Sequence, residues 1–410
     1  MRAGASATPA PAPRSGVGEL LLGLASVFVF LALLEGVARL VDLRPRSGAA
    51  LANPPWLGER WLLPRSDYRE RLRAAGFLGR YYELFEWDRF LIYRLRPRRQ
   101  LQMIDPFSRG IARDDGVFTV ETNAHGFRSR DFGTRAPGRV RIVALGDSST
   151  FGWGVEANEV YTERLREALE RRAGAPPEGV EVLNLGVPGY STFQGLVLLE
   201  RTALPLEPDL VTWSFLSNDG ALTGEADRAA YARRQGLAGA LLAALHHSRA
   251  FETLEAWIAV GRQRLRPARA SPQPSPDARN VAGLAEAERN VREAVTRARD
   301  AGVALVLVAQ CVRPPHSTLL GRVAASEGLP FLDAWALLQA AAPRVATEPG
   351  FEADRAWLRS RYAERTLAAQ RGLFTLLPDG CHPNAVGHRL VGEALAELVA
   401  PKLPLESTRE

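Results

Sequence analysis

The feature that most limits the fold of this chain is a set of four short apolar runs that alternate with helical stretches. The runs are RIVAL at 141–145, VEVLNL at 180–185, LVTWSFL at 210–216 and VALVLVAQ at 303–310. Gly, Pro, Asn or Asp bounds these runs, and charged stretches such as EANEVYTERLREALERRAG separate them. Strands buried on both faces read as continuous apolar runs, and parallel strands need crossover helices. The pattern therefore predicts an α/β fold, with a parallel sheet covered by helices on both faces.

Four short polar motifs fall at the ends of these predicted strands or after the last of them. They are LGDSST at 145–150, NLGVPGYST at 184–192, SNDG at 217–220 and DGCHPN at 379–384. Open α/β sheets bind their ligands at the carboxyl edge of the strands. We therefore expect the motifs to meet at one edge of the sheet.

Together the motifs supply the parts of a serine nucleophile site. A serine hydroxyl needs a base to take its proton, and a histidine base needs a carboxylate to hold its tautomer. Ser148 directly follows a predicted strand, and Asp379 and His382 precede the last predicted helix. We expect Ser148 to be the nucleophile, His382 the base and Asp379 the orienting acid. The expected oxyanion-hole donors are the N–H groups of Ser148 and Gly189 and the side chain of Asn218.

The order G-D-S, G-x-x-G, N-D, D-x-x-H resembles that of the SGNH (GDSL-type) serine esterase/hydrolase superfamily, over about residues 141–400. The resemblance implies a three-layer α/β/α flavodoxin-like sheet and ester cleavage through a Ser–His–Asp triad. It also implies neither a metal nor an organic cofactor. The segment TNAHGFRSRDFG, just upstream of RIVALGDSSTFGWGV, looks like a bacterial membrane-anchored branch of that superfamily.

One position departs from the superfamily pattern. The third motif normally reads G-x-N-D, and Leu216 stands here in place of the glycine. Asn218 is retained, so the donor remains, but we expect a stiffer loop. The sequence around Ser148 does not match G-x-S-x-G, which disfavours a nucleophile-elbow α/β-hydrolase.

These residues are compatible with more than one function. The main hypothesis is a serine hydrolase of the esterase, lipase or deacetylase type, acting on an ester-bearing small molecule, lipid or glycan. An O-acyltransferase on a glycan or lipid would use the same triad. A non-catalytic scaffold of the same fold is the third alternative, although no triad member is missing.

An uncharged apolar run, LLLGLASVFVFLALL, occupies positions 20–34 near the N-terminus. At about 1.5 Å per residue this run is shorter than a bilayer core of about 30 Å. The helical pattern continues to Val41, however, and Glu35 and Arg39 are spaced to form an ion pair. We expect a transmembrane anchor at 18–42, with the catalytic domain outside the cytoplasm, in the periplasm of a bacterium.

Two alternatives to an anchor remain for this segment. A cleaved signal peptide would have Gly36 and Ala38 as the small residues before the cut, and a buried core helix would also accommodate a short apolar run. Because arginines flank both ends of the run, the positive-inside rule does not settle its orientation.

The rest of the chain divides by composition. We expect a disordered tail at 1–17, a lead-in region at 43–140, a hydrolase domain at 141–400 with an insertion at 220–280, and a C-terminal tail at 401–410. The lead-in is predicted to form short helices and then short strands near Gly116–Thr122. Its aromatic residues at 56–92 are expected to pack the lead-in, with sugar binding as the alternative. The insertion is predicted to be helical and then a Pro/Ser-rich flexible connector.

Several other polar residues have a structural interpretation. Asp147 and Asn184 are expected to shape their loops by bonding backbone N–H groups, with contact of Asn184 with the site as the alternative. His246 and His247 are read as the surface of a helix in the insertion. His316 follows a predicted strand and is a candidate for lining the pocket. The histidines show no metal-ligand spacing.

Charge and cysteine content exclude other classes of protein. The net charge is +6, from 52 basic and 46 acidic residues, and the two signs are interleaved, which disfavours a nucleic-acid partner. The two cysteines, Cys311 and Cys381, are too few for a disulfide scaffold or a cysteine-built zinc site. Both are predicted at the same sheet edge, where they are either free thiols or a bridge that braces the D-x-x-H loop.

Overall fold

The predicted parallel sheet is present in the computed structural model, which describes residues 16–41, 43, 81–173, 179–223, 225–265, 279–280, 282–311 and 315–403. Its strands are β5 (Val140–Gly146), β6 (Val180–Asn184), β7 (Leu210–Ser214), β10 (Ala304–Val308) and β11 (Phe331–Leu332). All pairs are parallel, in the order β11-β10-β7-β5-β6. This is the flavodoxin-like order, which reverses beside the first strand, β5. The two-residue β11 has no apolar run of its own, and the sequence did not predict it.

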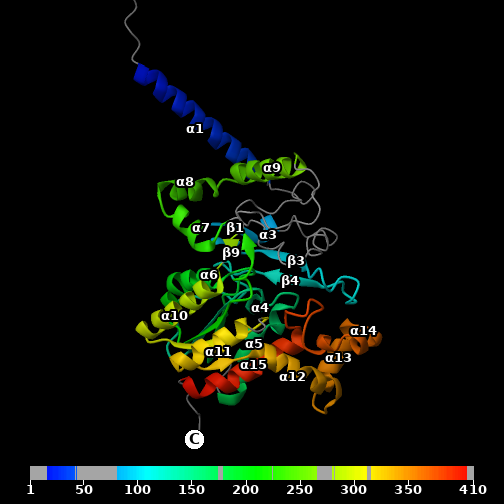
Figure 1. The fold of residues 1–410 in the computed structure, drawn as a ribbon. Coiled ribbons are helices and arrows are strands. Elements are labelled where there is room, and N and C mark those ends of the chain that lie inside the picture. The colour runs from blue at the N-terminus through cyan, green and yellow to red at the C-terminus, as the bar shows by residue number, and fades with distance from the viewer. Residues whose placement is uncertain are drawn as a thin grey trace, which may run out of the picture.

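Side chains along each strand alternate between two cores, one on each face of the sheet. Val143 and Leu145 belong to one hydrophobic cluster, whereas Ile142 and Ala144 belong to the other. The first cluster includes residues of α6 (Thr192–Leu198), α10 (Leu284–Asp300) and α11 (His316–Glu327). The second includes residues of α5 (Tyr161–Ala173), α12 (Ala334–Thr347) and α15 (Ala385–Val399). The result is the expected three-layer α/β/α arrangement (Figure 1).

The lead-in region builds two antiparallel hairpins above the sheet. After α3 (Tyr81–Leu84), β1 (Phe85–Asp88) pairs with β2 (Ile92–Leu95), and β3 (Gln100–Ile104) pairs with β4 (Val117–Glu121). The strand expected near Gly116–Thr122 is thus present, whereas the helices expected before residue 81 lie outside the described residues.

The core of the lead-in is continuous with that of the sheet. Phe85, Tyr93 and Phe118 belong to the same cluster as Val143 and Trp213 of the sheet. The Tyr93 hydroxyl also donates to the carbonyl of Pro188, 2.9 Å away, on the loop after β6. Residue 140 therefore marks a change of topology but does not separate two cores.

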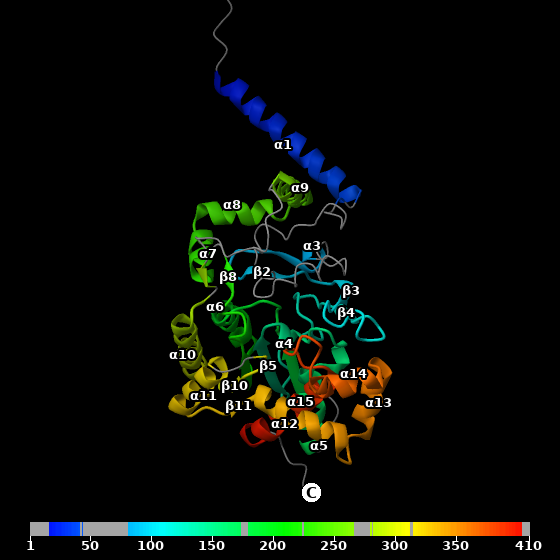
Figure 2. The ribbon, with the colours of Figure 1, turned by 45° about the vertical axis from the view of Figure 1, so that its right-hand side comes forward.

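The insertion at 220–280 is mainly helical, as expected. It contains β8 (Leu222–Thr223), α7 (Asp227–Arg234), α8 (Leu237–Leu245), α9 (Arg249–Leu265) and β9 (Arg279–Asn280). The Pro/Ser-rich connector at 266–278 lies outside the described residues. In Figures 1 and 2, α8 and α9 lie on the far side of the β1–β2 hairpin from the sheet.

Short elements complete the described chain. They are α4 (Ser148–Phe151), α13 (Glu352–Arg361), α14 (Glu364–Ala369), a π-helical turn at Leu199–Ala203, and 3-10 turns at Ala157–Glu159, Leu204–Leu206, Arg371–Phe374 and Ala400–Lys402.

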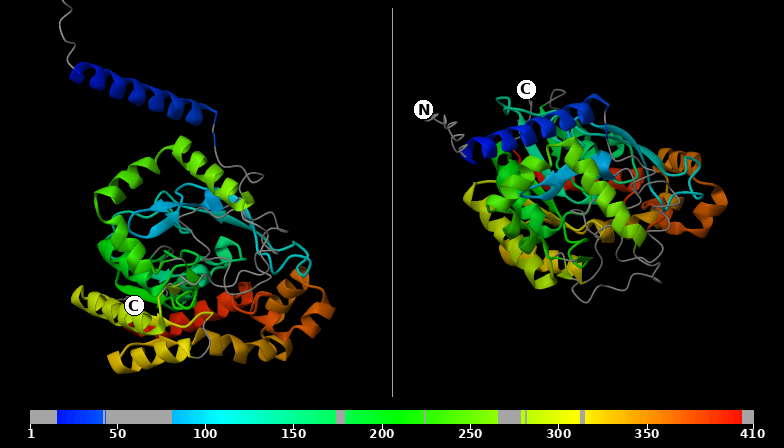
Figure 3. Two further views of the ribbon diagram at one scale, coloured as in Figure 1. Left: turned by 45° about the horizontal axis from the view of Figure 1, so that its top comes forward. Right: turned by 90° about the horizontal axis from the view of Figure 1, so that it is seen from above.

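The N-terminal apolar segment forms one long helix, α1 (Gly16–Leu40). Its stretch Val17–Leu40 has 24 residues and a mean hydropathy of 2.4, which is long and apolar enough to cross a membrane. Figure 3 shows α1 (blue) projecting from the folded body. Its apolar side chains are exposed, from Val17 at 67% to Val37 at 56%, which does not fit the alternative of a buried core helix.

Candidate active site

Ser148 lies on a tight turn between β5 and α4. Asp147 caps the helix, because its carboxylate accepts a hydrogen bond of 3.0 Å from the N–H of Ser149. Gly146 has no room for a side chain, since a Cβ would lie 2.8 Å from the carbonyl oxygen of Ser214 on β7. Gly152 ends the short helix with φ +81°, a conformation that favours glycine. The turn therefore fixes the backbone on both sides of the Ser148 hydroxyl.

His382 and Asp379 reach Ser148 from the loop before α15. The Nε2 atom of His382 lies 2.8 Å from the Oγ of Ser148, and its Nδ1 atom is hydrogen-bonded to a carboxylate oxygen of Asp379. The other oxygen of Asp379 accepts from the N–H groups of Cys381, at 2.9 Å, and of His382, at 3.1 Å. The structure thus brings together the three residues expected to act as nucleophile, base and orienting acid.

The surrounding carboxylates favour a protonated His382. Burial opposes the charged imidazolium, but the adjacent Asp379, with smaller contributions from Asp105 and Asp147, raises the pKa of His382 above its usual 6.5. Burial likewise opposes the Asp379 anion, and the charge of His382 outweighs it and lowers the pKa of Asp379. The pair is therefore arranged to stabilise a proton taken up by the imidazole.

The expected oxyanion donors lie on three neighbouring loops. Gly189 has φ +80°, so its loop uses a conformation that glycine adopts readily. The amide of Asn218 donates to the carboxylate of Asp147, at 3.2 Å, and to the carbonyl of Tyr190, at 3.1 Å. Asn218 is therefore held between the Ser148 turn and the Gly189 loop, with its amide hydrogens directed at these two acceptors.

Asp147 and Asn184 have the structural contacts predicted for them. Asp147 is buried, which raises its pKa, and it accepts hydrogen bonds from Ser149 N–H and the hydroxyl of Ser217. Asn184 accepts from the N–H of Gly186 at 2.9 Å and donates to the carbonyl of Thr150 at 2.7 Å. The second contact ties the end of β6 to the helix that carries Ser148.

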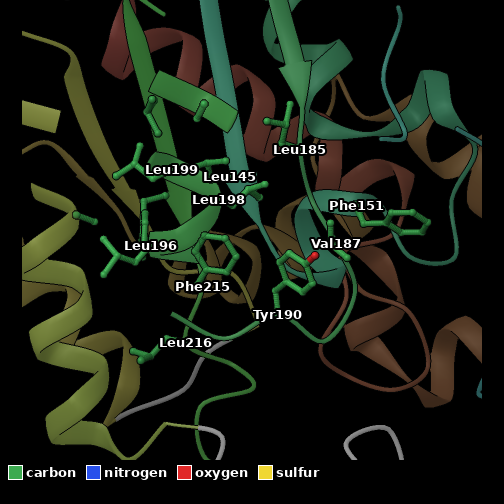
Figure 4. Close-up of a cluster of buried hydrophobic side chains, with 14 of the residues drawn as sticks. Leu145, Phe151, Leu185, Val187, Tyr190, Leu196, Leu198, Leu199, Phe215 and Leu216 are labelled. Carbon is green, nitrogen blue, oxygen red and sulfur yellow. The ribbon is translucent and has the colours of Figure 1, made fainter. Parts of the chain in front are cut away.

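The backbone at Leu216 explains why a glycine is usual there. Leu216 has φ +119°, a region that side chains with a Cβ rarely adopt. Its side chain is fully buried and belongs to the hydrophobic cluster of which Figure 4 shows a part. Packing therefore holds a strained backbone in place two residues before Asn218.

Sequence reasoning missed two buried residues that the lead-in contributes to the site. Asp105 follows β3, is fully buried, and accepts from the hydroxyl of Ser108 at 2.5 Å. Trp153 is close to both this acid and the base, since its Nε1 is 3.4 Å from Asp105 and its ring centroid is 6.4 Å from that of His382. Burial and the nearby Asp379 charge raise the pKa of Asp105.

Arg128 is the other missed residue. It belongs to the TNAHGFRSRDFG segment, and its guanidinium donates to four backbone carbonyls while only 4% of the residue is exposed. Two of these carbonyls, those of Phe151 and Gly152, end the short helix that begins at Ser148. The arrangement of arginines in the sequence gives no sign that Arg128 is buried.

Cys311 and Cys381 form a disulfide, with Cα atoms 4.7 Å apart. Of the two readings left open by the sequence, the bridge is therefore the one observed. It joins the end of β10 to the loop between Asp379 and His382, and so braces the D-x-x-H segment.

The other histidines are placed as follows. The surface assignment is wrong for His246, because its side chain is only 6% exposed and its ring stacks on Trp87, with centroids 4.9 Å apart. His247 is exposed, as expected. His316 lies beside the Asn218 loop, where a Cβ on Gly220 would be 3.9 Å from its Nε2. This position is consistent with the suggestion that His316 lines the pocket.

The sequence matches a protein-family profile, and the structure is similar to several solved structures. The profile of the GDSL-like Lipase/Acylhydrolase family matches residues 144–390. A lipase/acylhydrolase from Enterococcus faecalis is 18% identical, with a TM-score of 0.36, and the match covers 66% of this chain and 100% of that one. The acetylxylan esterase Axe2 from Geobacillus stearothermophilus is 16% identical, with a TM-score of 0.34, over 65% of this chain and 95% of that one. No curated protein matches the sequence.

Proposed function

The chain belongs to the GDSL-like lipase/acylhydrolase family of ester-hydrolysing enzymes, and we propose that Ser148, His382 and Asp379 are its catalytic triad. The observation that carries this proposal is the 2.8 Å contact between the Ser148 hydroxyl and His382 Nε2, with Asp379 bonded to the other ring nitrogen. The contact has the geometry that a base needs to remove a serine proton.

The reaction proceeds through an acyl-enzyme. The Oγ of Ser148 attacks the ester carbonyl while its proton passes to Nε2 of His382, and Asp379 stabilises the resulting imidazolium. The tetrahedral adduct collapses, its C–O bond breaks, and the imidazolium protonates the departing alcohol. Water, deprotonated by His382, then attacks the acyl carbon. The second adduct collapses as the bond to the Oγ of Ser148 breaks, the imidazolium returns its proton to that oxygen, and the acid is released.

The oxyanion is bound by the N–H groups of Ser148 and Gly189 and by the amide of Asn218. In the structure that amide donates to Asp147 and to Tyr190. We infer that the oxyanion takes over one of these two hydrogen bonds, which stabilises the adduct relative to the bound ester.

We propose that the enzyme works at a membrane, outside the cytoplasm, on an ester-bearing lipid, glycan or small molecule. Two observations support this location. α1 is long and apolar enough to cross a bilayer. The Cys311–Cys381 bridge is of a kind that persists mainly in oxidising compartments, such as the bacterial periplasm.

The test is hydrolysis of p-nitrophenyl acetate, butyrate and octanoate by the full-length protein in detergent. Ser148→Ala should remove all turnover above background. Ser149→Ala is the matched control, because this neighbouring hydroxyl is buried without a hydrogen-bond partner among the described residues, and so has no hydrogen bond with His382 or Asp379. A wild type no faster than Ser148→Ala on every ester would reject the hydrolase. A fluorophosphonate probe should label the wild type and not Ser148→Ala.

The two alternative functions give different outcomes in the same assays. An O-acyltransferase would form the acyl-enzyme and pass the acyl group to an added sugar hydroxyl, so acylated glycan would accumulate in place of free acid. A scaffold would neither turn over esters nor react with the fluorophosphonate. Complete assembly of the triad favours catalysis over the scaffold.

A further inference from the structure

The helices α8 and α9 of the insertion carry an apolar face that the folded body leaves uncovered. This α8–α9 apolar face consists of Leu237, Leu241, Leu245, Leu254, Trp257 and Ile258. The exposed fraction is 89% for Leu237, 62% for Leu241 and 56% for Trp257. The spacing of three or four residues places these side chains along one side of each helix. Contiguous apolar surface of this kind marks an interaction site in a folded protein.

The other side of the two helices is held to the lead-in by specific contacts. Glu252 on α9 forms an ion pair of 2.7 Å with Arg96, and His246 after α8 stacks on Trp87. Thr253 and Ala256 of α9 are buried. The apolar face therefore points away from the β1–β2 hairpin and is fixed in that orientation.

The turn between α8 and α9 is also joined to the end of α1. The carboxylate of Glu35 accepts from the hydroxyl of Ser248, at 2.7 Å, and from the N–H groups of Arg249 and Ala250, each at 3.2 Å. Arg39 donates to the carbonyl of His247 at 3.0 Å. A carboxylate at this position satisfies the first N–H groups of α9, which have no partner within the helix.

These contacts place the apolar face at the level where α1 would leave a bilayer. Glu35 and Arg39 lie in the last two turns of α1, and charged residues at the ends of a span lie in the headgroup region. Figures 1 and 2 show α9 beside this end of α1, with α8 next to α9 and the body beyond them. A tryptophan among leucines on a helix that lies along the boundary is typical of interfacial helices.

We propose that the α8–α9 apolar face inserts into the interfacial layer of the same bilayer that α1 spans. The molecules that cover the face are thus membrane lipids. The proposal requires that α1 is retained as a membrane span, and it does not depend on the ester chemistry. Removal of α1 as a signal peptide would take Glu35 with it and leave the start of α9 without its acceptor. The enzyme is thus attached to the membrane at two adjacent places, by a span and by a surface patch.

The test uses full-length protein in vesicles of phosphatidylcholine and phosphatidylglycerol, with a fluorophore on one introduced cysteine. The native cysteines are bonded to each other, so the label goes to the new thiol. Three positions are compared: Leu241→Cys on the face, Leu24→Cys within α1, and Glu364→Cys on α14 as the control. The side chain of Glu364 is 84% exposed, and α14 lies far from α1 in Figure 1. Each label is exposed to a nitroxide-bearing lipid and, separately, to aqueous iodide.

We expect the lipid nitroxide to reduce the emission of the labels at positions 24 and 241 by at least half. We expect iodide to quench only the label at position 364. Quenching by lipid at 24 but by iodide at 241 would leave the anchor in place and overturn the docking. A label at 241 shielded from both quenchers would mean that a second copy of the chain covers the face, which also overturns the proposal. Quenching by iodide at both 24 and 241 would overturn the span and the docking together. Activity on p-nitrophenyl esters is not part of the readout, so failure of the proposed chemistry would be seen separately.

Discussion

Replacing Arg128 by methionine tests whether the lead-in region holds the nucleophile turn in place. The guanidinium donates to the carbonyls of Gly152, Val155 and Thr119 at 2.6–2.7 Å and to that of Phe151 at 3.2 Å. Methionine fills much of the same volume but offers none of these donors. The carbonyls at the end of the Ser148 helix would then lose an important partner.

The expected loss follows from these contacts. Hydrogen bonds from a charged group contribute about 1.5–3 kcal/mol each, which would give roughly 6–12 kcal/mol for four independent bonds. Burial of the charge offsets part of this sum, as the lowering of the Arg128 pKa to about 10 indicates. The change leaves four carbonyls without this donor, at about 1–3 kcal/mol each, but it also removes the burial cost of the charge, so we take about 3–5 kcal/mol as the expected loss in free energy of unfolding. At about 2 °C per kcal/mol for a large domain, the melting temperature should fall by about 6–10 °C.

The assay is thermal unfolding of the oxidised, full-length protein in detergent, followed by tryptophan fluorescence, together with ester hydrolysis at 25 °C. The matched control is Arg130→Met, because the side chain of Arg130 is 67% exposed and makes one ion pair of 3.1 Å with Glu163. We expect the control to change the melting temperature by at most about 2 °C. Arg128→Met should also lower kcat well below the melting range, because the Ser148 turn loosens. A melting temperature for Arg128→Met equal to that of the control would refute the reasoning.

Four further predictions concern the surroundings of the triad. His382 must be neutral to accept the proton of Ser148, and its pKa is raised above 6.5. We therefore expect kcat/KM to fall as the pH drops, with a midpoint above 6.5. A midpoint below 6.5 would contradict this prediction. Asp379→Asn should lower that midpoint and reduce kcat by about 10⁴-fold, as measured in a pH–rate series. Asp105→Asn should lower the midpoint by less and retain most of kcat, because Asp105 acts on His382 only through its charge. The double variant Cys311→Ser, Cys381→Ser should lose about 2–4 kcal/mol of stability, and reductant should destabilise the wild type to the same extent but leave the double variant unchanged.

The sheet, the meeting of Ser148 with Asn218 and the pairing of Asp379 with His382 were predictable because they follow from local patterns and sheet topology. The runs at 141–145 and 210–216 are apolar on both faces, so they had to be interior strands. Parallel strands place their carboxyl ends at one edge, which brings Ser148 and Asn218 together without knowledge of any loop. The spacing of Asp379 and His382 allowed their pairing to be predicted in the same way.

Apart from the strand near Gly116–Thr122, the lead-in could not be predicted, because its structure depends on distant parts of the chain. The turn between β1 and β2 has no Asn-Gly or Asp-Gly signal, and Ile92 takes φ +72° there. The surface prediction for His246 was wrong because the sequence around His246 does not indicate its contact with Trp87, which lies 159 positions earlier. Asp105 reaches the site only because the β3–β4 hairpin packs on the loops above the sheet.

The shared core of the lead-in and the sheet also determines when this protein can fold. Phe85 and Tyr93 leave the ribosome before any strand of the sheet, but their cluster includes Leu307 of β10. At about 5–20 residues per second, the roughly 220 residues between them take about 10–45 s to synthesise. During that interval the aromatic side chains of the lead-in lack their partners, while α1 has already been made. The long sequence separation of these contacts predicts slow folding, and it makes protection from aggregation during synthesis a requirement of the fold.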